Sequence, residues 1–344
     1  MLNVNSTQAH EGKTWTKAVA AMFGTSALLA VLVIAFALPA SRSGPHDVPI
    51  GIVGTPAQID GFRSATNGFA VSIYHTSPDA RQAIEHRQID GALILNSPTE
   101  VDIMVATAAS PTAAALLQAV GQHIAQVTHR SAHIDEVRGF PHRDPKGIGL
   151  AAGALPLALG GFMGAVVIMM LIPGPAGRVL TAVGFAVIGG LAIVATLQYV
   201  IGTFDGNFWM TSLAGMFGIA ATCFTVLGLR EVLGSPGLGI AAILLVLLGN
   251  PLSGLGGGPE MLPTPWGAIG QLLPPGATGA LMRNVAFFNG YGATKPLIIL
   301  ACYLIGGATL FALGAARTRR TGTIDVDRIE FDRQLLDRAR PITG

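Results

Sequence analysis

The sequence predicts a polytopic α-helical membrane protein with six transmembrane helices and an α/β extracytoplasmic domain between helices 1 and 2. Of its 344 residues, 51% are hydrophobic and only 12% are charged, about half the usual charged share of a soluble domain. The only charged residues between Gly147 and Arg317 are Arg178, Asp205, Arg230, Glu231, Glu260, Arg283 and Lys295. Helices with so few charges have no polar face to offer water. A polar stretch separates the first apolar run from the others.

Six apolar runs are candidate spans, because about 20 apolar residues cross the hydrocarbon core. They are Ala18–Leu38, Ile148–Ile172, Val179–Ile201, Phe208–Leu229, Leu238–Asn250 and Pro296–Ala316. The fifth run is short unless it begins near Val232. The first follows Lys13 and Lys17, as a secretory signal would, but it exceeds the roughly 7–15 apolar residues of such a signal. We therefore expect a retained helix.

The basic residues indicate the orientation of the chain. Six spans place both termini on one side, together with Lys13, Lys17, Arg178, Arg230, Arg317, Arg319 and Arg320. The other side receives Arg42, Arg143, Lys146, Arg283 and Lys295. Cytoplasmic loops carry the excess of Lys and Arg, so both termini are expected in the cytoplasm, with the protein in the plasma membrane.

This orientation divides the chain into five parts. They are a cytoplasmic lead (1–17), the first transmembrane helix (18–40), an extracytoplasmic α/β domain (41–147), a five-helix block (148–316) and a cytoplasmic tail (317–344). The mixed charges of the tail suit a solvated helix or a contact with a partner, of which we favour the first.

The polar stretch predicts strands and helices in alternation. Strands are expected in HDVPIGIVG, GFAVSIYHT, GALIL and VDIMVAT. A helix over SPDARQAIE would be capped by Ser77 or Asp79 and would turn Ala80, Ala83 and Ile84 inward. A second helix over 110–129 would be capped by Ser110, with Pro111 at its first position.

Few residues suggest chemistry. His129 and His133, with His123 nearby, have the i,i+4 spacing that shares a metal on a helix, but a solvated helix face is the favoured interpretation. Asp79 with Glu85, or Asp90 with Glu100, would be acid–base pairs of a kind that any surface offers. We therefore expect no catalytic residue and no metal site.

Three further features exclude other classes of protein. Gly12-Lys13-Thr14 lacks the first glycine and the strand of a phosphate-binding loop. Cys223 and Cys302 lie in apolar runs and give no disulfide framework. Without a basic stripe and interleaved aromatic residues, nucleic acid is not an expected partner.

The segment MLPTPWGAIGQLLPPGATGALMRN (261–284) is apolar, yet prolines divide it into pieces too short to span a bilayer. Pro274 and Pro275 must separate two short helices. Irregular backbone at membrane depth has to be covered by protein, so a re-entrant hairpin over 258–294 at the outer leaflet is expected. The alternative is a membrane-surface loop anchored by Trp266, Phe287 and Phe288.

The interiors of the predicted spans contain no Asp, Glu, Lys, Arg or His. Carriers driven by ions or protons use such groups to bind the coupling ion. If the chain moves a substrate, we expect the energy to come from another protein and the substrate to be amphipathic.

The chain resembles the type-2 ABC-exporter permeases, and among them the group related to the YhgE/Pip phage-infection proteins. The resemblance is carried by one span before an external α/β domain, by VPIGIVG after that span, by DARQAIEHRQIDGALIL, and by the broken hairpin LPTPWGAIGQLLPPGATGALMRN before the last span. It covers about residues 14–316.

The resemblance implies a transport mechanism. Two permease subunits, as a homodimer or heterodimer, would form a pore in contact with membrane lipid. A separate cytoplasmic ATPase would bind ATP and Mg, with no cofactor in this chain. The expected gate residues are Trp266, Gln271, Pro274, Pro275, Arg283, Phe287 and Phe288. The expected ATPase-coupling surface is Lys13, Lys17, Pro173, Gly174, Arg178, Arg230 and Glu231.

Two other functions remain open. The external domain of a non-transporting scaffold or receptor would bind a partner, as the phage-infection relatives suggest. A membrane enzyme would need a clustered acid, base or metal site at the membrane face, for which the sequence offers no convincing candidate. The exporter subunit is the favoured hypothesis.

Overall fold

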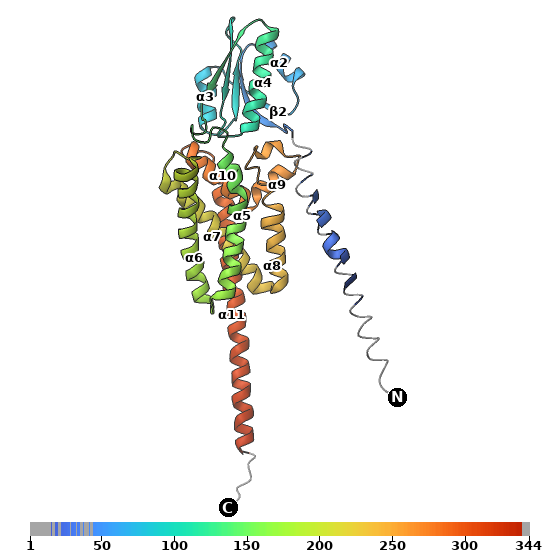
Figure 1. Cartoon of the computed structure of the whole chain (residues 1–344), viewed down its shortest axis with the longest axis vertical. Helices are drawn as coiled ribbons and strands as arrows, with labels where there is room; N and C mark the ends of the chain where they lie inside the picture. Colours follow the sequence, from blue (N-terminus) through green and yellow to red (C-terminus); the bar gives the residue numbers. More distant parts are fainter. Residues whose placement is uncertain are drawn as a thin grey trace, which may run out of the picture.

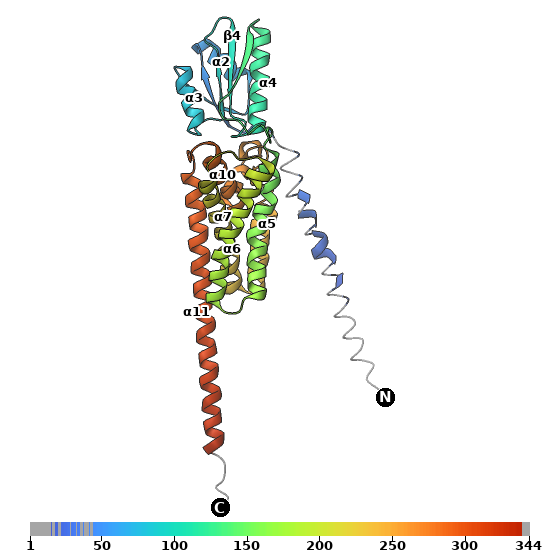
Figure 2. The same cartoon turned by 60° about the vertical axis from the view of Figure 1, so that its left-hand side comes forward.

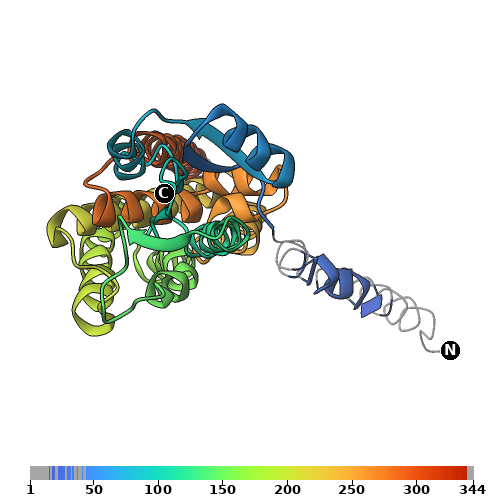
Figure 3. The ribbon, with the colours of Figure 1, turned by 90° about the horizontal axis from the view of Figure 1, so that it is seen from above.

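The computed structural model describes residues 44–338 and, before them, a discontinuous set between Trp15 and Ser41. An α/β sheet domain stands at one end of a block of helices (Figure 1). Seen from above, the sheet domain lies over the helical block (Figure 3). Lys13, Lys17 and parts of the first predicted span lie outside the described residues.

The sheet domain has five strands in the order β2-β1-β3-β4-β5. Their bounds are β1 Val48–Val53, β2 Phe69–Ile73, β3 Gly91–Ile94, β4 Glu100–Val105 and β5 Ser131–Glu136. Strand β1 is parallel to β2 and β3, β4 is antiparallel to β3, and β5 is parallel to β4. The sequence predicted the first four strands and missed β5.

Three helices cover the two faces of this sheet. Helices α2 (Pro56–Ala65) and α4 (Pro111–Val127) pack on one face, and α3 (Ser77–Glu85) packs on the other (Figure 1). The core residues alternate accordingly along β3, where Leu93 faces α4 and Ala92 faces α3. Ala80, Ala83 and Ile84 of α3 are buried as predicted, while α2 was not predicted.

The helix caps differ in part from those predicted. Ser110 accepts a hydrogen bond from the Ala113 amide, which confirms it as the cap of α4. Helix α3 is capped by Thr76, whose hydroxyl accepts from the Asp79 amide, and not by Ser77 or Asp79. The Thr76 hydroxyl also donates to the Asp79 carboxylate, so Asp79 stabilises the cap from the third helical position.

The predicted helical spacing of His129 and His133 is wrong. Helix α4 ends at Val127, and Thr128 caps it. His129 then adopts a left-handed conformation with φ of 54°, and His133 lies in β5. The chain therefore turns back into the sheet where the sequence pattern suggested a continued helix.

The helical block continues the chain from residue 148. Its elements are α5 Ile148–Leu171, α6 Pro175–Ala195, the π-helix η1 Thr196–Ile201, α7 Phe208–Leu233, α8 Ser235–Ala241, the π-helix η2 Ala242–Leu248, the 3₁₀ helix η3 Pro259–Met261, α9 Trp266–Leu272, α10 Pro274–Phe287 and α11 Thr294–Arg338. Helix α7 lies at the centre and packs against α5, α6, α10 and α11 (Figure 2).

Three helices among the described residues are long and apolar enough to cross a membrane. They are Pro175–Ile201, Phe208–Leu233 and Thr294–Arg317. Shorter apolar helices within the described part of the chain are Met22–Val31, Leu159–Leu171 and Ser235–Leu248. The chain thus combines membrane-type helices with a separate α/β region.

The segments between the predicted spans on the terminal side, 173–178 and 230–237, are partly helical. Helix α6 begins at Pro175, so Arg178 lies in its first turn and not in a Pro173–Arg178 loop. Helix α7 runs to Leu233 and includes Arg230 and Glu231. Gly174, with φ of 80°, makes the turn between α5 and α6.

Candidate functional site at the domain junction

The proline-broken segment forms two helices, as predicted. Helix α9 ends at Leu272, and α10 begins at Pro274 with Pro274 and Pro275 in its first turn. Proline fits there because the first amides of a helix have no partner within it. Both prolines are buried, as is nearly all of α10, which packs against α5, α7, α9 and α11. This burial satisfies the requirement that broken backbone be covered by protein.

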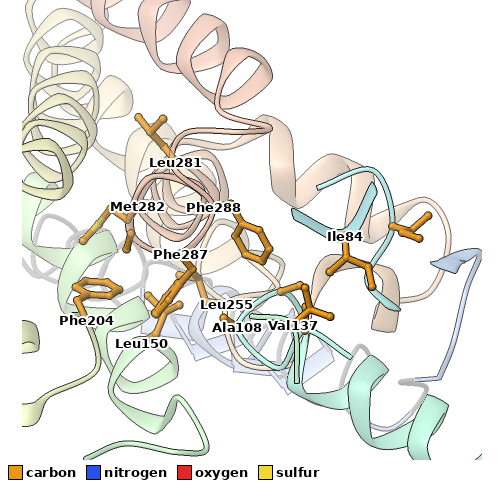
Figure 4. Close-up of a cluster of buried hydrophobic side chains, with 14 of the residues drawn as sticks. Ile84, Ala108, Val137, Leu150, Phe204, Leu255, Leu281, Met282, Phe287 and Phe288 are labelled. Atoms are coloured by element: carbon orange, nitrogen blue, oxygen red, sulfur yellow. The ribbon is translucent and has the colours of Figure 1, made fainter. Parts of the chain in front are cut away.

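The end of α10 is buried among aromatic rings. Phe287 meets Phe140 edge to face at 5.1 Å and Phe204 at 5.7 Å between ring centroids. Phe288 is 1% exposed and lies toward the sheet domain, on the side of Ile84 and Val137 (Figure 4). These two side chains therefore do not anchor the segment on a membrane surface. Trp266 is 40% exposed and remains the one aromatic of that alternative still at the surface.

Arg87 ties the sheet domain to α10. It follows α3 with φ of 58°, and its Nη1 donates to Asp90 Oδ1 at 2.7 Å. Its Nε donates to Asn284 Oδ1 at 3.3 Å, and its guanidinium lies 4.9 Å from the ring centroid of Phe288. One cation thus contacts an anion of its own domain and two residues at the end of α10.

Arg283 brings a second cation into the same buried region. It is 3% exposed, and its Nη2 donates to the Leu255 carbonyl at 2.7 Å. It interacts electrostatically with Glu260 and Asp90 and repels Arg87. We call Arg87, Asp90, Glu260 and Arg283 the junction cluster. Its two cations and two anions come from three separate segments: Arg87 and Asp90 belong to the sheet domain, whereas Glu260 and Arg283 belong to the helical block. Docking of the sheet domain therefore brings two oppositely charged pairs together in one buried region.

Burial shapes the electrostatics of this cluster. The pKa of Asp90 is raised by desolvation, although Arg87 and Arg283 oppose the shift. The pKa of Glu260 is raised by desolvation and by the neighbouring Asp90. Within the described part of the chain, Glu260 Oε1 and Arg283 Nε are buried without a hydrogen-bond partner. A buried polar atom without a partner costs about 1–3 kcal/mol, so these two atoms lower the stability of the docked junction.

Two hydrogen bonds to backbone carbonyls and one stacked pair of rings also hold the junction together. The Ser110 hydroxyl donates to the Gly257 carbonyl at 2.6 Å while it caps α4. The His46 amide donates to the Glu260 carbonyl at 2.9 Å. His86 stacks on Tyr291, with 4.0 Å between ring centroids. The loop before α9 and the loop after α10 are therefore both attached to the sheet domain.

Asp144 anchors the linker between the sheet domain and α5. Its carboxylate accepts hydrogen bonds from the Ile148 and Gly149 amides, both at 2.8 Å, and from the Thr203 hydroxyl at 2.7 Å. A carboxylate suits the start of a helix because the amides there are unpaired and the helix dipole is positive. The start of α5 is thus fixed to the segment after η1.

The opposite end of the helical block carries a smaller set of polar contacts. Arg178 Nη1 lies 3.2 Å from Glu231 Oε2, and Arg178 Nε donates to the Ile172 carbonyl at 3.1 Å. The side chains of Arg178 and Glu231 are 24% and 18% exposed. Part of the predicted coupling surface is thus assembled, with α6 joined to α7.

The remaining residues that the sequence singled out lie in separate parts of the structure. Gln271 Nε2 donates to the Ser253 carbonyl at 2.7 Å, inside the hairpin region. Glu85 pairs with Arg138, and Asp90 pairs with Arg87, so the proposed acid–base pairs are not formed. His133 instead lies opposite Asp102, and with Glu100 their potential ligand atoms are within 4.8 Å of one another. The sequence signal for this group was the alternation of Glu100 and Asp102 along one strand. The signal could be used only if the segment that contains His133 had been recognised as the neighbouring strand β5.

Comparisons with protein-family models, with curated proteins and with solved structures give no match to this chain. The functional hypothesis therefore depends on the geometry of the junction. The junction joins the sheet domain to the buried helix α10, which contacts the central helix α7.

Proposed function

We propose that this chain is the membrane permease subunit of an ATP-driven exporter of the type-2 ABC kind, which moves an amphipathic or lipid-like substrate outward. The observation that carries the proposal is the position of α10, packed against α7, α5 and α11 and tied to the sheet domain by the junction cluster. A movement of the transmembrane helices would shift α10, and α10 would transmit this shift to the sheet domain at the outer face.

Six spans complete this proposal. They would be the helix over 18–40, α5, α6 with η1, α7, α8 with η2, and the part of α11 before Arg317. Both termini would then lie in the cytoplasm and the sheet domain outside the plasma membrane. Cysteines introduced at Ser72 and Thr321 should label from opposite sides of intact cells, and labelling from the same side would contradict the topology.

The side of the helical block offers a path for an amphipathic substrate. A groove of about 290 Å³ lies between α5 and the α6–η1 helix. Its lining includes Gly153, Pro156, Ile193 and Leu197, and none of the described lining residues is charged. The π-helical turns of η1 border it, and such turns are frequent at functional sites. A hydrocarbon chain entering from the lipid would meet an apolar surface there.

A partner ATPase would supply the energy, because the interiors of the described apolar helices carry no ionisable coupling group. It would bind at the end of the block that carries Arg178 and Glu231, and two permease subunits would enclose the pore. The gate would be formed by the α9–α10 pair, including Trp266, Gln271 and the two prolines.

Purification of the tagged full-length protein in mild detergent, followed by mass spectrometry of co-eluting proteins, tests the proposal. We expect a stoichiometric ABC ATPase, which Arg178→Glu should release. Lys146→Glu, a charge reversal at the other end of the block, should retain it. A preparation that contains no ATPase even after crosslinking would contradict the exporter and favour the receptor hypothesis.

A further inference from the structure

Helices α2 and α4 lie on the same face of the sheet, and α3 lies on the opposite face. The face that carries α2 and α4 has a groove. It has a volume of about 650 Å³ and lies between α2 and α4, within the 300–1,000 Å³ range of small-molecule pockets. Its lining includes Phe62 of α2, Leu95 just after β3, and Val120 and Ile124 of α4. We call it the α2–α4 groove. Its walls suit a hydrocarbon chain.

Arg130 is held at one end of this groove. Its Nη1 donates to the carbonyls of Leu95 and Ser97 at 3.0 and 3.1 Å, and its Nε donates to Thr128 Oγ1 at 2.9 Å. A guanidinium carries two further N–H donors on Nη2. The bonds to the loop after β3 fix the orientation of the cation before any ligand arrives, which lowers the entropic cost of binding.

The charges of the groove indicate the kind of ligand. Arg130 is the charged residue among the described lining residues, and none of them is acidic. A carboxylate or phosphate would pair with the guanidinium through charge-assisted hydrogen bonds. The combination of an apolar groove and a fixed cation fits an amphipathic anion.

The position of the groove indicates where this ligand comes from. Ser110, at the start of α4, touches the helical block through Gly257, whereas the lining uses α4 only from Ala119 onward. A helix rises about 1.5 Å per residue, so the groove lies well beyond the junction. Its ligand would arrive from the aqueous phase and not from within the bilayer.

We propose that the α2–α4 groove binds a free amphipathic anion of the fatty-acid class, with its hydrocarbon chain between α2 and α4 and its head group on Arg130. This site is separate from the α5–η1 groove, and its occupancy does not depend on the transport function. Each buried CH₂ should tighten binding by roughly fourfold, until the chain fills the groove.

A photoreactive diazirine derivative of dodecanoate tests the site on the full-length protein in nanodiscs of neutral lipid. We expect crosslinks on peptides from α2 and from the end of α4, competed by unlabelled dodecanoate and at least tenfold more weakly by octanoate. Empty nanodiscs correct for partitioning into lipid. Crosslinks confined to the helical block would overturn the proposal.

Two pairs of variants separate the apolar and charged parts of the site. Ala119→Trp should block the groove and abolish labelling, whereas Ala115→Trp, on the same helix but outside the lining, should not. If Ala119→Trp lowers the unfolding temperature, Ala119→Leu replaces it. Labelling unchanged in a folded groove variant would contradict the site.

Arg130→Gln should weaken competition by dodecanoate about tenfold and leave competition by dodecanol within twofold. Arg63→Gln, on α2 but outside the lining, should change neither. Equal loss for the acid and the alcohol would overturn the role of Arg130 as the head-group contact.

Discussion

The two ends of the helical block both carry ion pairs, but they are built differently. At the sheet-domain end, four charges from three segments are buried together, and two of their polar atoms have no hydrogen-bond partner among the described residues. At the other end a single pair, Arg178 and Glu231, remains partly exposed. Buried charges require all their partners in place, whereas exposed ones tolerate change.

This contrast suggests a division of labour. The sheet-domain end forms a buried joint, because docking the domain packs the Arg87–Asp90 pair against Glu260 and Arg283 of the helical block. The other end keeps its pair accessible, as a surface that exchanges partners requires.

Arg283→Met should have the largest effect on stability. It leaves Asp90 and Glu260 with one cation in place of two, and the loss of one partner from a buried ionic group costs about 3–5 kcal/mol. Thermal unfolding in detergent should show a clear fall in midpoint, while Arg143→Met, at an exposed position, should change it little. Wild-type stability in Arg283→Met would show that the cluster does not hold the joint.

Phe288→Ala should destabilise the junction almost as much. The side chain is 1% exposed and lies beneath the Arg87 guanidinium, so its loss leaves a cavity and removes a cation–π contact. Such truncations cost about 3–5 kcal/mol, and the lower end applies if the loop after α10 relaxes. Trp209→Ala removes a larger ring that is 68% exposed and should cost far less by the same measurement.

The pH dependence of stability should be shaped by the junction carboxyls. Burial raises the folded-state pKa of Asp90 and Glu260 above their usual values, so folding binds protons. Their contribution is fully present below the unfolded pKa values of 3.8 and 4.5 and is lost as pH rises through the raised folded values. Stability should therefore increase on acidification from neutral pH towards pH 5.

Glu260→Gln isolates this effect. The amide cannot ionise, so the free energy of unfolding should depend less on pH in this variant. The difference in slope should reach at most about 1.4 kcal/mol per pH unit, the value for one proton. Arg87, Arg283 and Asp90 remain around the substituted side chain. Glu100→Gln, on the partly exposed side of β4, serves as the control, and an equal flattening there would remove the junction from the explanation.

The fold was predicted best where local patterns suffice. Strands β1 to β4, the inward face of α3, the Ser110 cap and the break at Pro274 all follow from alternation, capping or proline chemistry within a few residues. Strand β5 was missed because its alternation is exposed on both faces, SAHIDE having only one partly buried position. A strand without an apolar face has no period to detect.

The junction cluster was only partly predictable. Arg283 drew notice as a rare charge in an apolar segment, yet its partners Asp90 and Glu260 lie on other segments. No local period relates Arg283 to Asp90, because 283 − 90 = 193 positions separate them in the chain. The Asp90–Glu100 pair, which was disfavoured from the sequence, is not formed, because Asp90 pairs with Arg87 and Glu100 lies near Asp102 and His133.

The smallest expected stability effect concerns Arg178 and Glu231. Breaking this partly exposed pair by Arg178→Glu or Glu231→Arg should cost only about 1 kcal/mol, and the double reversal should recover most of it. ATPase association should not recover in the double variant. The partner would recognise which helix carries the positive charge and which the negative, and the double reversal exchanges them. If the double variant regains stability but not the partner, this end acts as a recognition surface; if it regains both, the pair serves only to hold α6 against α7.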